Sequence, residues 1–126
     1  MGRLAHLWDV IRAVAPATVL PERDASGLWN LPGSMIYFPR HGIRALVPMS
    51  RRVKRAILGL EEAAERKRVF HLWFHPTNLA DGVDEMCEGL DLIFAHALRL
   101  KTGGALSIAS MSAMISSVSQ VVRFDQ

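Results

Sequence analysis

Apolar residues recur at helical spacing in four stretches of the chain, and each stretch predicts a helix. The first covers residues 4–14 and ends before Pro16. The second begins at Ser50, which we expect to cap it, and ends near Lys67. The third runs from about residue 84 to 101, with Asp81 or Asp84 as its cap and Gly103 beyond its end. The last begins at Ser110 and ends near residue 122.

Two of these helices carry stripes that predict which face is buried. The stripe of the second helix consists of Val53, Ile57, Leu60 and Ala64, and that of the third consists of Cys87, Leu90, Phe94, Ala97 and Leu98.

Between the second and third helices lies a short apolar run, from Val69 to Phe74, which predicts a buried strand. Side chains of a strand alternate between its two faces. One face of this strand therefore carries polar and aromatic groups, and the other is apolar. The first face holds His71, Trp73 and His75, and the second holds Phe70, Leu72 and Phe74.

Shorter extended pieces are expected at 28–38, Ile43–Val47 and Ala105–Ala109, and residues 21–27 read as a polar loop. The alternation of helices and strands over the last part of the chain is typical of parallel α/β structure. A complete α/β barrel takes about 250 residues. A chain of 126 residues, predicted to be one domain spanning 1–126, can therefore supply at most part of a barrel.

Composition narrows the function classes. Half of the residues are apolar, and the net charge of +3 is too small to indicate nucleic-acid binding. The one basic cluster, Arg51, Arg52, Lys54 and Arg55, is interpreted as a solvated face, or else as an anion site. Cys87 is the single cysteine, so an internal disulfide is excluded, and no export signal or membrane span is apparent. We expect a cytoplasmic protein.

The spacing His71-x-x-x-His75 suggests a zinc site, but strand geometry argues against it. Four steps along a strand cover about 13 Å, too far for two imidazoles to hold one ion. His75 is the better candidate for chemistry because it ends the strand, where α/β proteins carry catalytic groups. His71 is equally compatible with a hydrogen-bonded structural role. The remaining histidines, His6, His41 and His96, show no signal of a ligand role.

The string Arg68-Val-Phe-His-Leu-Trp-Phe-His-Pro-Thr-Asn-Leu79, followed by a helix and Gly-Ala-Leu-Ser-Ile-Ala-Ser-Met111, resembles the closing part of bacterial polysaccharide deacetylases. These enzymes form the NodB homology group, carbohydrate esterase family 4. Gly27-Leu-Trp-Asn-Leu-Pro-Gly-Ser34 resembles the segment that leads into that part, so the resemblance covers about residues 25–115. It implies a partial (β/α) barrel, the last strand-helix units of a deacetylase barrel.

The resemblance also implies roles for individual residues. The family removes acetyl groups from sugars with a divalent metal, such as zinc, held by an Asp and two His, and with a second Asp as base. A Leu-x-His motif near the carboxyl end supplies the general acid, which His75 matches, while Trp73 stands in the place of the Leu. Trp73, His71 and Trp29 are the candidate substrate-binding residues. The metal-binding motifs of the family have no matching position in this chain, so no cofactor is expected in the chain itself. We expect it to be inactive alone, with the amino-terminal part of the deacetylase as partner and an acetylated polysaccharide as substrate.

The alternative is a non-catalytic α/β protein that binds a carbohydrate or protein partner through the face that bears Trp29, Trp73 and His75. A partial barrel that lacks its neighbouring strands would expose apolar sheet edges, which would favour self-association.

Overall fold

A strand-helix-strand unit forms the centre of the structure. In the computed structural model, which describes residues 14–124, strand β3 (Met35–Ile36) pairs in parallel with β4 (Leu72–Trp73), and α2 (Met49–Arg66) connects them. The backbone N–H of Tyr37 donates to the carbonyl of Trp73 at 3.0 Å and extends this ladder by one residue. The parallel α/β pairing expected from the sequence is therefore present.

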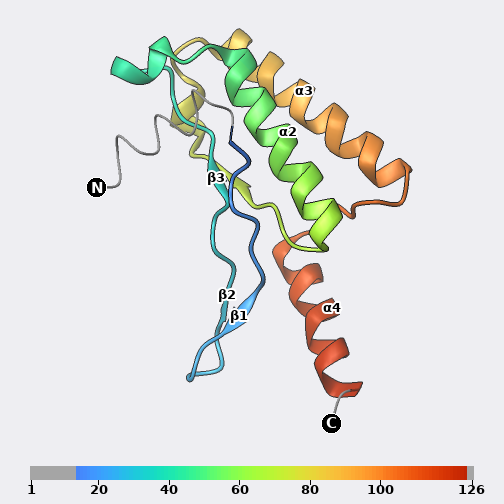
Figure 1. The fold of residues 1–126 in the computed structure, drawn as a ribbon. Helices are drawn as coiled ribbons and strands as arrows, with labels where there is room; N and C mark the ends of the chain where they lie inside the picture. The colour runs from blue at the N-terminus through green and yellow to red at the C-terminus, as the bar shows by residue number, and fades with distance from the viewer. Residues whose placement is uncertain (1–13, 125–126) are drawn as a thin grey trace.

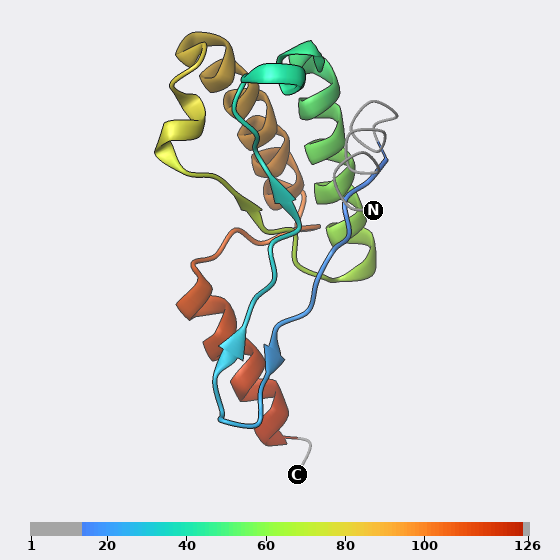
Figure 2. The same ribbon diagram turned by 90° about the vertical axis from the view of Figure 1, so that its left-hand side faces the viewer.

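Helix α3 (Val83–Thr102) packs along α2, and Figures 1 and 2 show the two helices side by side in both views. We call β3, α2, β4 and α3 the body. The nine residues of its buried core are Met35, Tyr37, Val53, Ala56, Leu60, Met86, Leu90, Ile93 and Ala97.

Tyr37 is the largest fully buried side chain and joins the sheet to α3. Its hydroxyl donates to the carbonyl of Met86 at 2.9 Å. Gly89 makes this approach possible, because a Cβ at position 89 would collide with the Tyr37 hydroxyl. Burial raises the pKa of Tyr37 to about 12.

The helices begin and end close to the predicted positions, but the predicted capping residues of α2 and α3 are wrong. Helix α2 begins after Pro48 and not at Ser50, and it ends at Lys67 as expected, in a left-handed conformation with φ 52°. Neither Asp81 nor Asp84 caps α3, since Gly82 stands at its start without a side-chain hydrogen bond. Gly103 ends α3 as predicted.

Two predicted strands are wrong. Residues Gly42–Leu46 form a 3₁₀ helix instead of the strand Ile43–Val47, because the buried Arg52 donates to the carbonyls of Arg44 and Val47 and none of the described strands pairs with this segment. The segment 105–109 runs without regular structure between α3 and α4 (Met111–Phe124), as it pairs with none of the described strands.

A hairpin and a helix extend from the body (Figure 1). The hairpin pairs β1 (Glu22–Arg23) with β2 (Trp29–Asn30), so part of the predicted polar loop is a strand. Its turn is held by Asp24, whose carboxylate accepts from the Ser26 hydroxyl at 2.6 Å and from the Ser26 and Leu28 N–H groups. These bonds, the one from the Ser26 hydroxyl first, lower the pKa of Asp24.

Helix α4 extends from the same end of the body as the hairpin (Figures 1 and 2). Ser110 caps it as predicted, because its Oγ accepts from the Ala113 N–H at 3.2 Å. We call the hairpin, the segment 105–109 and α4 the extensions. The structure is mixed α/β with three α-helices and two small sheets, without a closed barrel among residues 14–124. None of the helices in this range is long and apolar enough to cross a membrane. The predicted helix 4–14 falls almost wholly outside the described residues.

Candidate functional site

Strand β4 and its continuation to residue 75 divide their side chains as the sequence predicted. Phe70, Leu72 and Phe74 pack against the body core. Phe74 also meets the ring of Tyr37 edge-on, with centroids 6.1 Å apart. The other face is left for His71, Trp73 and His75.

The indole of Trp73 packs against the backbone just before β3, so closely that Gly33 has no room for a side chain. A Cβ at Gly33 would stand 2.5 Å from the indole Nε1. The ring stays 39% exposed, and it meets the imidazole of His75 edge-on at 5.8 Å between centroids and 87° between planes. The structure therefore joins these two predicted site residues in one accessible pair.

His75 ends the extended run at the carboxyl end of the parallel pair. Its backbone is extended and its carbonyl accepts from the Asn78 N–H at 2.8 Å, which starts the 3₁₀ helix Pro76–Leu79. The residue is exposed, so a molecule in solution can reach its imidazole. An accessible imidazole can serve as a general acid or base.

The strand ends beneath this pair are pinned in place. The buried Asn78 donates from Nδ2 to the carbonyl of Tyr37 at 3.1 Å, one residue beyond β3. The turn after β4 is thereby tied to the turn after β3. This hydrogen bond restrains the backbone that follows His75 relative to the end of β3.

The other two predicted site residues are held elsewhere. His71 is half-buried, and its Nδ1 lies 3.2 Å from the carbonyl of Pro32, which fits a structural hydrogen bond. Trp29 lies on β2 of the hairpin, under the guanidinium of Arg23 at 6.0 Å. Figures 1 and 2 show β2 well apart from the body, so Trp29 is not part of the group around Trp73.

The prediction that the basic cluster forms a solvated face is correct for two of its four residues and wrong for the other two. Arg51 and Lys54 are exposed, but Arg52 is only 3% exposed, and its guanidinium donates to the carbonyls of Phe38, Arg44 and Val47. Burial lowers its pKa. Arg55 is also buried and donates to the carbonyl of Val14 at 3.2 Å. These arginines bind backbone carbonyls, which argues against an anion site at this cluster.

The sequence did not predict three polar contacts made by two histidines outside the strand, His96 and His41. His96 of α3 lies 3.3 Å from the carboxylate of Glu61 on α2, and its Nδ1 lies 2.8 Å from Arg99. His41 lies 3.5 Å from Asp81, and both are exposed. Only the spacing of His96 and Arg99 within one helix is visible in the sequence. The other partners are brought together by the fold.

Among residues 14–124, no three His, Cys, Asp or Glu side chains lie together closely enough to hold a metal ion. The donor set that the deacetylase resemblance requires is therefore not formed by this part of the chain. No protein-family model matches the chain, and neither does any curated protein or solved structure.

Proposed function

We propose that this chain is the carboxyl-terminal part of a polysaccharide deacetylase, which hydrolyses acetyl groups from a sugar polymer, and that it is inactive alone. One observation carries the proposal. The exposed His75, paired with Trp73, stands at the carboxyl end of two parallel strands, where α/β enzymes place their reacting groups. The proposal includes the finer architecture, a partial (β/α) barrel that the other part of the enzyme completes.

The proposed role of His75 is general acid. When water adds to the acetyl carbonyl and the tetrahedral intermediate collapses, the bond to the sugar oxygen or nitrogen breaks, and the imidazolium gives its proton to that atom. This kind of proton transfer contributes about 10²–10⁴ in rate. Trp73 would limit the space for the acetyl group, since an indole replaces the Leu of the family motif.

In the family, a divalent metal polarises the acetyl carbonyl. Because residues 14–124 do not form a metal site, no step is assigned to a metal in this part of the chain. The Asp and His ligands would have to come from the partner polypeptide, and the acetylated polysaccharide would bind between the two parts. We place the assembled protein in the cytoplasm as part of the proposal.

The test is acetate release from an acetylated oligosaccharide by the chain joined to its amino-terminal part. The proposal expects no release by the chain alone, turnover by the joined protein, and a loss of about 10²–10⁴ in kcat for His75→Ala. His41→Ala is the matched control, because this imidazole is 86% exposed and lies outside the Trp73–His75 pair. Metal-dependent acetate release by the chain alone, or equal turnover in both variants, would refute the proposal.

The second candidate is a non-catalytic protein that binds a sugar through Trp73. It is favoured by the exposed ring beside a hydrogen-bonding imidazole, an arrangement suited to stacking against a sugar face. Retention of the isolated chain on a chito-oligosaccharide column, lost in Trp73→Ala and kept in Trp29→Ala, would support this candidate. It predicts the same retention whether or not another polypeptide is present.

A further inference from the structure

The 3₁₀ helix Gly42–Leu46 carries two strongly exposed large apolar side chains. Leu46 is 80% exposed and Ile43 is 62% exposed. Side chains three residues apart lie above one another in a 3₁₀ helix, so these two share one face. Val47, which follows the helix directly, is buried, so the turn meets the body with a different face. The face that bears Ile43 and Leu46 is therefore turned to the outside.

This outer face stands on a fixed base. The buried Arg52 donates to the carbonyls of Phe38, Arg44 and Val47. The guanidinium of Arg44 also lies over the ring of Phe38, 4.3 Å from its centroid. The exposure of the two apolar side chains is therefore a property of the folded turn and does not come from a lack of contacts with the body.

The turn lies at the end of the body from which neither extension projects. Figures 1 and 2 show it in teal beside the start of α2, while the hairpin and α4 lie at the opposite end. It follows β3, so it lies at the carboxyl end of the parallel pair, as His75 does. Neither the hairpin nor α4 stands between this turn and a flat surface.

Basic residues are concentrated in and around the turn. No acidic residue occurs between Asp24 and Glu61, and this stretch contains the basic residues Arg40, Arg44, Arg51, Arg52, Lys54 and Arg55. Three of them, Arg44, Arg51 and Lys54, have no carboxylate partner among residues 14–124, and the last two are exposed. Both lie in the first turns of α2, where side chains tilt toward the start of the helix and thus toward the 3₁₀ turn.

The acidic groups at this end belong to the start of α3. Glu85 forms an ion pair with Arg40, and Asp81 lies 3.5 Å from His41. Asp84 is exposed. The basic residues of the turn and of the first turns of α2 outnumber these three carboxylates. The surface around the two apolar side chains therefore keeps an excess of positive charge.

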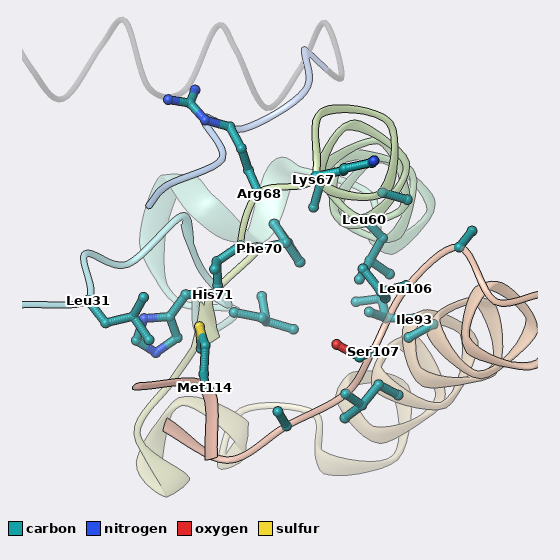
Figure 3. Close-up of a pocket in the computed structure, with 18 of the residues that line it drawn as sticks. Leu31, Leu60, Lys67, Arg68, Phe70, His71, Ile93, Leu106, Ser107 and Met114 are labelled. Carbon is teal, nitrogen blue, oxygen red and sulfur yellow. The ribbon is translucent and has the colours of Figure 1, made fainter. Parts of the chain in front are cut away.

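The cleft beside β4 is also apolar, but it lacks a charge of this kind. It has a volume of about 620 Å³ and a lining that includes Phe94 and Leu106. Figure 3 shows the side chains of Lys67 and Arg68 directed away from it. Charge therefore indicates what the turn binds, and it gives no such indication for the cleft.

Apolar side chains beside lysines and arginines are the combination that holds peripheral proteins on membranes of anionic lipid. From the outer face, its fixed base and the excess of positive charge, we infer that this protein docks on the surface of a bilayer that contains anionic lipid. We call the residues that make the contact the docking surface: Ile43, Arg44, Leu46, Arg51 and Lys54. The apolar groups enter the boundary between headgroups and acyl chains, and the cations remain at the phosphates.

The first test is sedimentation of the whole chain with vesicles. One set consists of phosphatidylcholine alone, and the other of equal parts of phosphatidylcholine and phosphatidylglycerol. We expect binding to the anionic vesicles only, and weaker binding when salt screens the charges. Equal binding to both sets, or binding to neither, would overturn the inference.

Two double variants with the same loss of charge test where the cations must lie. Arg51→Ala with Lys54→Ala changes the docking surface, while Arg68→Ala with Lys101→Ala changes exposed cations near the carboxyl ends of α2 and α3. Each cation near an anionic membrane contributes about fivefold in affinity, so the first pair should lower vesicle affinity about tenfold or more. The second pair should leave it nearly unchanged. Equal losses would show that total charge alone attracts the chain, and the inference would fail.

Two single variants test the apolar contact. Leu46→Ser should lower the affinity for anionic vesicles about tenfold, because it removes a leucine that is buried on docking. The matched control is Leu28→Ser, since Leu28 is 69% exposed but lies on the hairpin. It should leave the affinity unchanged. Circular dichroism of each variant checks that the fold is kept.

An acidic polypeptide is the competing occupant of this surface. If polyglutamate displaces the chain from the vesicles and Leu46→Ser binds as tightly as the unchanged protein, the surface binds anions by charge alone, and the inference is overturned. None of these readouts depends on acetate release. Failure of vesicle binding would therefore leave the proposed function untouched, and failure of turnover would leave the docking surface untouched.

Discussion

Met86 and Met111 are both helical methionines, yet the first is fully buried and the second is 55% exposed. The contrast holds for the regions they belong to. The body encloses a core that includes Tyr37 and Ile93, whereas the described part of the extensions adds to it one half-buried residue, Leu106, which packs against its edge. Packing within the chain therefore explains the body, and it leaves the extensions with apolar side chains that another surface could cover.

Truncation of the two methionines to alanine tests most directly whether the body is packed and the extensions are not. Met86→Ala should lower the free energy of unfolding by about 2–5 kcal/mol, because it leaves a cavity in the core. Met111→Ala should change it by less than about 0.5 kcal/mol. Urea unfolding of both variants measures the difference, and equal losses would show that α4 packs as firmly as the body.

Tyr37 offers a pH test of the body core. Its pKa is about 12 in the folded chain against 10.0 for the free side chain. Between these values the unfolded chain releases the proton while the folded chain keeps it, so stability is intact below pH 10 and falls as the pH rises toward 12. The expected loss is about 2–3 kcal/mol.

Tyr37 is the single tyrosine of the chain, so the absorbance of tyrosinate reports on it directly. The control is Tyr37→Phe, which should remove this part of the alkaline loss of stability. Titration of the folded protein near pH 10 would show that the ring is open to solvent.

Arg51 and Arg52 at the start of α2 allow the same comparison of an exposed and a buried side chain within the body. Arg52→Leu should lower the free energy of unfolding by about 1–3 kcal/mol, since the buried or half-buried carbonyls of Phe38, Arg44 and Val47 lose their donor. Arg51→Leu should stay within about 0.5 kcal/mol, because Arg51 is exposed. A chemical-unfolding series that gave both variants the same midpoint would contradict the carbonyl-binding role of Arg52.

The smallest effect on stability is expected on the outer side of α3. Leu98 is 56% exposed and lies outside the cleft that Phe94 lines, so Leu98→Lys should move the free energy of unfolding by less than about 0.5 kcal/mol. It should nevertheless lower self-association, measured by sedimentation, because it removes exposed apolar surface. Unchanged self-association would show that the surface responsible for it lies elsewhere on the chain.

The sequence was informative where local spacing decides the structure. Strand alternation correctly separated Phe70, Leu72 and Phe74 from His71 and Trp73, and Ser110 caps α4 as expected. The third helix was harder, because it is apolar on more than one side. Its predicted stripe included Cys87, Phe94 and Leu98, which the structure leaves exposed, while it omitted the buried Met86 and Ile93.

Features that depend on distant partners could not be predicted. Whether 105–109 becomes a strand depends on a neighbour, and none is present among the described strands. The sequence does not distinguish Arg52 from Arg51, because the three carbonyls that Arg52 binds are brought to it only by the fold. Trp29 and Trp73 both resemble binding residues, but only the fold shows that Trp73 lies beside His75 and that Trp29 lies on the hairpin.

The central claim is that this chain supplies the acid of a deacetylase whose metal site lies on another polypeptide segment. It is tested most directly by sequencing the DNA immediately upstream of the Met1 codon and translating it in all three frames. The account predicts a strand that ends in Asp-Asp and a His-Ser/Thr-x-x-His-Pro segment. Finding neither would contradict the account, and the catalytic role of His75 should then be dropped.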